Sequence, residues 1–275
     1  MIKLGRFRLS IDTEDVSKPF LEHLEDLRQT ILRSLGALGI GMLVAVPLAP
    51  TILAWLKRPL AKALGDPAKV DEFLWGWEVV GAFTLAMKIM FWAGLIFSAP
   101  FIVFFIAQFV FPGLTPKERY VIRRSGGAAV LLFIFGVTLA YWFCLPVGIR
   151  AMLGIYRWLG IRPQWTVSSY ITFALQFLLA FGLVFELPVV LVILGRLGLV
   201  SAEFLRTYRR HVYVLLFIVA AVLTPPDIFS QLLMGLPLVV LYEICIFLIA
   251  ATERERDPWP AKPDSSQEPS IENES

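Results

Sequence analysis

The chain has 275 residues, of which 57% are hydrophobic and 17% are charged. Soluble domains carry about 25% charged residues, so this composition is typical of a membrane protein with several spans. The net charge of +3 argues against a nucleic-acid partner, and two cysteines and two histidines argue against a disulfide framework or a histidine-based metal site.

The predicted elements follow from the lengths of the apolar segments. Residues 1–19 are charge-rich, without a cleavable signal peptide, and we expect them to form a cytoplasmic N-terminal segment. A membrane-spanning helix needs about 20 apolar residues. Six segments are predicted to span: 31–56, 82–111, 126–149, 169–195, 212–224 and 228–251. We therefore expect an all-α, polytopic membrane domain over residues 20–251, followed by a disordered cytoplasmic tail over 252–275.

The last two predicted spans are unusual. The apolar run "VYVLLFIVAAVL" is only roughly 18 Å long as a helix. The next span is interrupted by polar residues and Pro237, and "TPPD" at 224–227 favours a turn between the two. We expect residues 211–251 to form a short helical hairpin that does not reach full bilayer depth.

The distribution of Lys and Arg predicts the orientation. With the N-terminus inside, six spans return the C-terminus inside, and the inner segments hold 17 basic residues against seven outside. Both termini are therefore predicted to face the cytoplasm.

Two segments on this inner side carry acidic residues. In "PFLEHLEDLRQTILRSL" the apolar residues recur at helical spacing, while Glu22, Glu25 and Asp26 fall on the opposite side. They form either a binding surface for a cationic partner or N-terminal acids that favour the helix dipole. In "FVFPGLTPKERYVIRR", Glu118 precedes Arg119. On local evidence alone, this segment fits an ordinary basic cytoplasmic loop in which one acid balances part of the positive charge.

Two acids fall inside predicted spans. Glu186 lies in "FALQFLLAFGLVFELPVVLVILG", two residues before Pro188, and Glu243 lies within the last span. Charges at this depth are costly, so such acids are expected to be protonated, paired or exposed to water. Glu186 and Glu243 could form hydrogen bonds between helices, or contacts between subunits of a scaffold that does not itself transport. They could also be the proton-binding groups of a proton-coupled secondary transporter. The chain shows no internal repeat, which disfavours the transporter. Without an HExxH, GxSxG or Walker motif, an enzyme is not expected.

In order along the chain, these features resemble the TatC family, the polytopic core of the twin-arginine protein translocase. The resemblance is carried by "FLEHLEDLR" at 20–28, "RPL" at 58–60, "FPGLTPKER" at 111–119, "SYITFALQFLLAFGLVFELP" at 169–188, "LTPPDIFSQ" at 223–231 and "YEICIF" at 242–247.

The resemblance implies a fold and an activity. The fold is a curved, glove-like wall of six helices whose last two are short. The protein would bind the Arg-Arg motif of signal peptides on folded precursors. With TatA- and TatB-type single-span partners, it would move these precursors across the bacterial cytoplasmic membrane, driven by the proton-motive force. It would act as a homo-oligomer in a complex, without a cofactor.

The resemblance also implies site residues. The arginine contacts are Asp26 and Glu118, and Glu22 and Arg119 are expected to belong to the same signal-peptide-binding surface. The family usually has glutamate where this chain has Asp26, so Glu25 is the alternative for the second contact. The residues expected to make polar or partner contacts within the membrane are Glu186, Gln231, Asp227 and Glu243. The motif positions with a structural role are Pro59, Phe109, Pro112, Leu114 and Pro188. Glu186 is expected on the concave face, within reach of water, and neutral or hydrogen-bonded.

Overall fold

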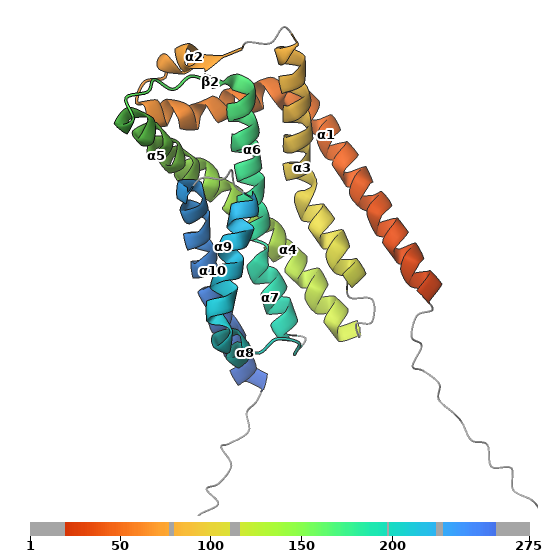
Figure 1. Cartoon of the computed structure of the whole chain (residues 1–275). Coiled ribbons are helices and arrows are strands. Elements are labelled where there is room, and N and C mark those ends of the chain that lie inside the picture. Colours follow the sequence, from red (N-terminus) through yellow and green to blue (C-terminus); the bar gives the residue numbers. More distant parts are fainter. Residues whose placement is uncertain (1–19, 77–79, 111–115, 197, 224–227, 257–275) are drawn as a thin grey trace, which may run out of the picture. The chain divides into compact units, whose positions relative to one another are not determined.

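The computed structural model describes residues 20–76, 80–110, 116–196, 198–223 and 228–256. Within these ranges it does not describe the side chains of 20–22, 110, 116–125, 222–223, 230, 252 and 254–256. The described chain is almost entirely helical, as predicted (Figure 1). The described residues form two compact units. The first comprises those of 20–120 and 140–179, and the second those of 121–139 and 180–256.

In the first unit, two long helices pack side by side: α1 (Phe20–Leu64) and α3 (Gly81–Val110). They approach most closely at Gly41 and Gly94, because a Cβ at Gly94 would lie 2.7 Å from the backbone nitrogen of Met42. Figure 1 shows that α1 bends along its length, and prolines inside a helix are the usual cause of such bends. The prolines inside α1 are Pro47, Pro50 and Pro59.

The rest of the first unit lies at the far end of α1. The short helix α2 (Lys69–Phe73) leads into strand β1 (Leu74–Trp75), which pairs in parallel with β2 (Trp165–Thr166). A π-helical turn, η1 (Ala140–Cys144), runs into α5 (Leu145–Trp158), which packs on α1. Lys88 Nζ on α3 donates to Ser168 Oγ at 2.8 Å, and this hydrogen bond ties α3 to the residues that follow β2.

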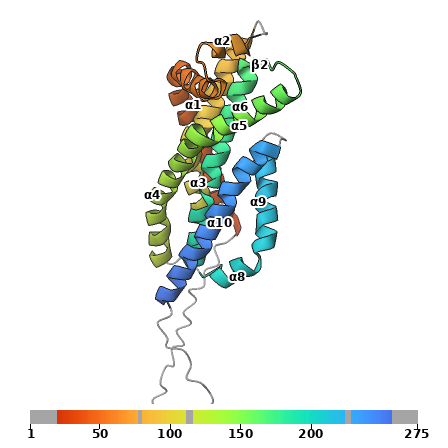
Figure 2. The same ribbon diagram turned by 90° about the vertical axis from the view of Figure 1, so that its left-hand side faces the viewer.

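The second unit contains most of α4 (Pro116–Leu139) and the C-terminal helices α7 (Leu187–Arg196), α8 (Ala202–Thr207), α9 (Arg209–Leu223) and α10 (Ile228–Arg256). Figure 2 shows α9 alongside α10, with α8 at their end. The side chain of Gln231 on α10 donates to the carbonyl of Phe217 on α9 at 3.2 Å. The predicted hairpin is therefore present.

Five helical segments of the described chain are long and apolar enough to span a membrane: His23–Leu64, Gly81–Phe109, Gly126–Trp158, Val167–Arg196 and Gln231–Ala251. The remaining predicted span is α9, which has 15 residues and is short, as expected. The prediction that the last helix is also short is wrong. The helix α10 has 29 residues and continues to Arg256, because Pro237, which was expected to interrupt the span, lies inside the helix without ending it.

The fourth predicted span contains a break. Instead of one helix over 169–195, α6 (Val167–Val184) ends before Phe185, and α7 begins at Leu187. Pro188, in the first turn of α7, has no N–H to donate to the carbonyl of Val184, so the helix restarts here. Most side chains of α6 are buried on every side, which explains why its sequence is apolar all round.

Candidate functional site

The N-terminal turns of α1 present acidic side chains beside the end of α3. The ring of His23 stacks on Phe109 with centroids 4.7 Å apart, and this contact holds the start of α1 against the last turn of α3. Glu25, whose side chain is 50% exposed, pairs with Arg28 at 3.2 Å. Asp26 is half-buried, and its carbonyl accepts a hydrogen bond from Thr30 Oγ1 at 2.8 Å.

Glu118 belongs to the first turn of α4, and five residues of chain separate the end of α3 from the start of α4. A connection of five residues spans at most about 20 Å, so the start of α4 lies within that distance of the end of α3, where Phe109 contacts His23. The side chains of Glu22, Glu118 and Arg119 lie outside the described residues, as do the residues Pro112 and Leu114. Their predicted roles stay predictions.

Glu186 lies in the break between α6 and α7. Its N–H donates to the carbonyl of Leu183 and its carbonyl accepts from Val190, each at 3.1 Å, so the backbone of the break is satisfied. The side chain is only 4% exposed, and its Oε1 has no hydrogen-bond partner among the residues described. Glu186 was expected to lie within reach of water, and the structure instead buries its side chain.

Glu243 occupies a polar cluster between α9 and α10. Its Oε2 lies 2.7 Å from Arg209 Nη2, and its Oε1 accepts a hydrogen bond from the hydroxyl of Tyr213. Beside it, the hydroxyl of Tyr242 donates to the carbonyl of Leu205 on α8 at 2.8 Å. Glu243 therefore joins two helices, which weakens its predicted role as a proton-coupling group.

Gln231 was predicted to contact a partner within the membrane, and here its side chain bonds Phe217 in the same hairpin. Asp227, the other predicted polar contact in this part of the chain, is not among the described residues. The two cysteines, Cys144 and Cys245, are buried and free. Over the described ranges, no group of three or more His, Cys, Asp or Glu side chains is arranged to hold a metal ion.

Comparison with known proteins identifies the family. Residues 22–237 match the family model described as Sec-independent protein translocase protein (TatC). The chain belongs to the TatC family. A TatC protein of Carboxydothermus hydrogenoformans is 39% identical over 86% of this chain and 94% of its own length. A TatC protein of Desulforapulum autotrophicum is 34% identical over 94% of this chain and 92% of its own.

A solved structure supports the same assignment. The crystal structure described as the twin arginine translocase receptor TatC superimposes with a TM-score of 0.72 at 31% identity, covering 84% of this chain and all of that one. The chain is thus a multi-pass membrane protein and a TatC-type component of a Sec-independent protein translocase. The predicted resemblance is confirmed.

The TatC-like motif "RPL" has a physical explanation that sequence reasoning missed. Pro59 has no N–H, so the carbonyl of Trp55 loses its helical partner. The hydroxyl of Tyr141 in η1 donates to that carbonyl at 2.8 Å, and the hydroxyl of Tyr170 donates to the neighbouring carbonyl of Leu56 at 2.6 Å. Pro59 itself is buried. The position of Pro59 in the sequence indicates that the Trp55 carbonyl lacks a helical donor. No signal in the sequence identifies the tyrosines that donate to this carbonyl and to the neighbouring one.

Arg209 and Tyr213 were also missed as partners of Glu243. The sequence offers one usable signal, because Tyr213 follows Arg209 by one helical turn and both therefore share a face of α9. Glu253 is a further missed contact, since its carboxylate accepts a hydrogen bond from the N–H of Ala202 at 3.0 Å and so ties α10 to the start of α8.

Proposed function

We propose that this TatC-family protein is the receptor for twin-arginine signal peptides on folded precursor proteins. The observation that carries the proposal is the acidic start of α1, where Glu25 and Asp26 lie in a segment held against the end of α3 by the His23–Phe109 contact. The relative with the solved crystal structure is described as a twin arginine translocase receptor, which supports the same role here.

The recognition rests on the chemistry of guanidinium and carboxylate groups. We infer that Asp26 and Glu118 each receive one arginine, with Glu25 as the alternative to Asp26. Each charge-assisted contact contributes about 1.5–3 kcal/mol, so two contacts separate Arg-Arg from an uncharged pair by more than about a hundredfold. Lysine has the charge but lacks the planar fork, so a Lys-Lys peptide binds more weakly.

The proposal extends to partners, energy and orientation. The protein acts in the bacterial cytoplasmic membrane, in a homo-oligomeric complex with TatA- and TatB-type subunits, and the proton-motive force drives transport. Both termini face the cytoplasm, which agrees with the excess of Lys and Arg on that side. The chain contributes a binding surface and no catalytic group of its own.

The experiment compares fluorescent Arg-Arg, Lys-Lys and Gln-Gln signal peptides for binding to the purified full-length chain. We expect the order Arg-Arg, then Lys-Lys, then Gln-Gln. The variants Asp26→Asn and Glu118→Gln each reduce Arg-Arg binding. Glu203→Gln is the matched control, because Glu203 is an exposed acid on α8, outside the proposed surface. Equal binding of all three peptides, or none, contradicts the proposal.

A further inference from the structure

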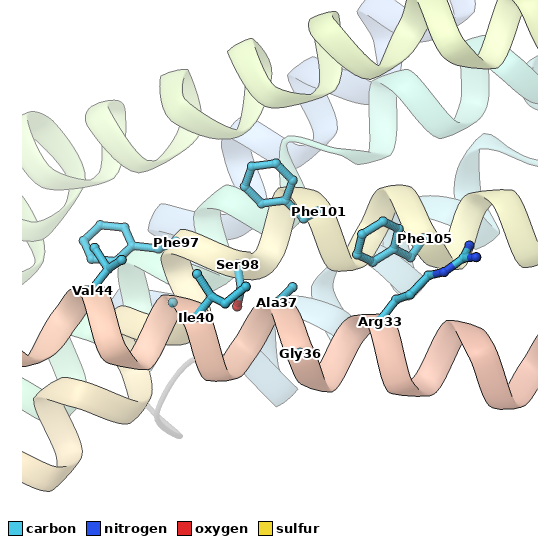
Figure 3. Close-up of a pocket in the computed structure, with 10 residues that line it drawn as sticks. Arg33, Gly36, Ala37, Ile40, Val44, Phe97, Ser98, Phe101 and Phe105 are labelled. Carbon is cyan, nitrogen blue, oxygen red and sulfur yellow. The ribbon is translucent and has the colours of Figure 1, made fainter.

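An apolar groove runs along the contact between α1 and α3. Its volume is about 570 Å³, within the range of roughly 300–1,000 Å³ that is common for small-molecule sites. Figure 3 shows the side chains that line it, which are almost all apolar. From α1 these are Arg33, Gly36, Ala37, Ile40, Gly41 and Val44, and from α3 they are Phe97, Ser98, Phe101 and Phe105.

Small residues on α1 leave the space that forms this groove. A Cβ added at Gly36 would meet no atom within 4 Å, so the groove is open at that position. At Gly41 the two backbones are in close contact, because an added Cβ would collide with the carbonyl of Gly94. The hydroxyl of Ser98 donates to the carbonyl of Gly94 at 2.9 Å and is therefore satisfied. The wall of the groove thus offers an apolar surface.

One end of the groove carries a positive charge. Arg33 Nη2 donates to Gln29 Oε1 on the preceding turn at 3.3 Å, and this hydrogen bond leaves the charge of the guanidinium uncompensated. The ion pairs formed by the described side chains do not include Arg33. In Figure 3 the Arg33 side chain extends from α1 on the side where Phe105 projects from α3. The groove therefore combines a cationic end with an apolar body.

The length of the groove matches one leaflet of a bilayer. From Arg33 to Val44 the helix rises by roughly 16 Å, and half of the hydrocarbon core of a bilayer is about 15 Å. Arg33 lies close to the predicted membrane boundary at residue 31. A cation at the boundary and an apolar channel of leaflet depth have the chemistry of a phospholipid site.

We propose that this groove binds an anionic phospholipid from the leaflet at the N-terminal end of α1. The phosphate lies on the Arg33 guanidinium, which is well suited to bidentate phosphate binding. One acyl chain lies against Ile40, Phe97 and Phe101. This lipid site goes beyond the receptor function and does not depend on it.

A signal peptide is the other occupant to consider. Asp26 lies on the same face of α1, but roughly 10 Å of helix further out, about one Debye length at 0.1 M salt. Its carboxylate therefore only weakly opposes a phosphate at Arg33. A peptide that carries two arginines would meet a like charge at Arg33 as it entered the groove. The charge at Arg33 therefore favours the lipid.

The experiment measures lipid retained by the purified full-length protein with native mass spectrometry. Phosphatidylglycerol and phosphatidylcholine with identical acyl chains are added in equal amounts. We expect the wild type to retain more phosphatidylglycerol. Arg33→Gln reduces the phosphatidylglycerol preference about fivefold, the effect expected for one cation at an anionic surface. Gly36→Leu fills the groove and reduces the retention of both lipids.

Gly39→Leu is the matched control. A Cβ at Gly39 also meets no atom within 4 Å, yet Gly39 does not line the groove, so this variant retains lipid as the wild type does. Thermal unfolding establishes that all three variants fold. Unchanged retention in both Arg33→Gln and Gly36→Leu overturns the proposal.

Two competition experiments test the identity of the occupant. We expect inorganic phosphate at the same concentration not to displace the lipid, because it lacks the acyl chain. Displacement by phosphate alone contradicts the proposal. A twin-arginine peptide that displaces the lipid and binds Gly36→Leu less tightly would assign the groove to the peptide instead. Neither competition result bears on the receptor proposal, which is tested by the comparison of Arg-Arg, Lys-Lys and Gln-Gln peptides.

Discussion

Arg209 Nη2 and Glu243 Oε2 lie 2.7 Å apart and join α9 to α10 across 34 residues of sequence. With the hydroxyl of Tyr213 on its other oxygen, Glu243 has a partner for each carboxylate oxygen. This arrangement explains how an acid is tolerated within an apolar helix, because the charge is paired and hydrogen-bonded. It also stabilises the hairpin that contains the shortest predicted span.

The first prediction concerns this pair. Glu243→Gln and Arg209→Gln each destabilise the hairpin, and the double variant is less destabilised than the sum of the two. The side chains are 36% and 43% exposed, so solvent screening limits the coupling energy to about 0.5–1 kcal/mol. Thermal unfolding of the purified protein in detergent measures it. Additive effects would show that the two charges do not interact.

The second prediction concerns Pro59 and Tyr141. Tyr141→Phe removes the hydrogen bond to the Trp55 carbonyl, and we expect a loss of about 0.5–1.5 kcal/mol because that carbonyl has no helical donor. In a Pro59→Ala background the N–H of residue 59 can bond that carbonyl. Tyr141→Phe then costs less in the same unfolding assay. An equal cost in both backgrounds would contradict this explanation of the proline.

The third prediction tests the close contact of α1 and α3. Gly94→Ala places a Cβ 2.7 Å from the backbone nitrogen of Met42 and 2.8 Å from its Cα, and backbone atoms cannot move aside easily. We expect destabilisation by about 1–3 kcal/mol. Gly39→Ala is the control, because the added Cβ enters open space. This variant also replaces a flexible residue within a helix by a better helix former. Comparable stability of the two variants would mean that the contact is looser than described.

The fourth prediction concerns Glu186 and rests on the proposed transport function. We expect Glu186→Gln to retain export of a folded twin-arginine reporter, because the amide keeps the size and polarity of this buried side chain and removes only its titrating proton. Glu186→Leu removes all polar atoms and loses export. Cellular fractionation with a folded reporter measures both variants. Loss of export in Glu186→Gln at normal membrane levels would instead favour proton transfer by the carboxyl group.

The fifth prediction concerns Glu118. Glu118→Ala abolishes export of folded cargo while leaving membrane insertion intact, because it removes one carboxylate for the arginine pair without changing the apolar spans. Immunoblotting of membrane fractions controls for insertion, and reporter export gives the result. If export persists, the arginine contact belongs to another acid, with Glu25 and Asp26 the first to test.

Much of the architecture follows from local sequence. A run of about 20 apolar residues must be helical in a bilayer, because the backbone has no other hydrogen-bond partner there. For this reason the range expected for the second span, 82–111, is close to α3. The break at Glu186 was less predictable. Pro188 marked a disturbance, but the sequence alone does not distinguish a bend from the end of a helix.

The sequence by itself determined the class of this protein, the short α9 and the acidic residues that are candidates for a functional site. Composition, periodicity and motif order can be read along the chain without knowledge of the fold. Only the tertiary structure decided what those acids contact. The pairing of Glu243 with Arg209, the bond from Tyr141 to the carbonyl that Pro59 frees, and the groove beside Gly36 all join residues that are distant in sequence or depend on helix packing. Such contacts depend on which faces of the helices meet, and no local pattern specifies that.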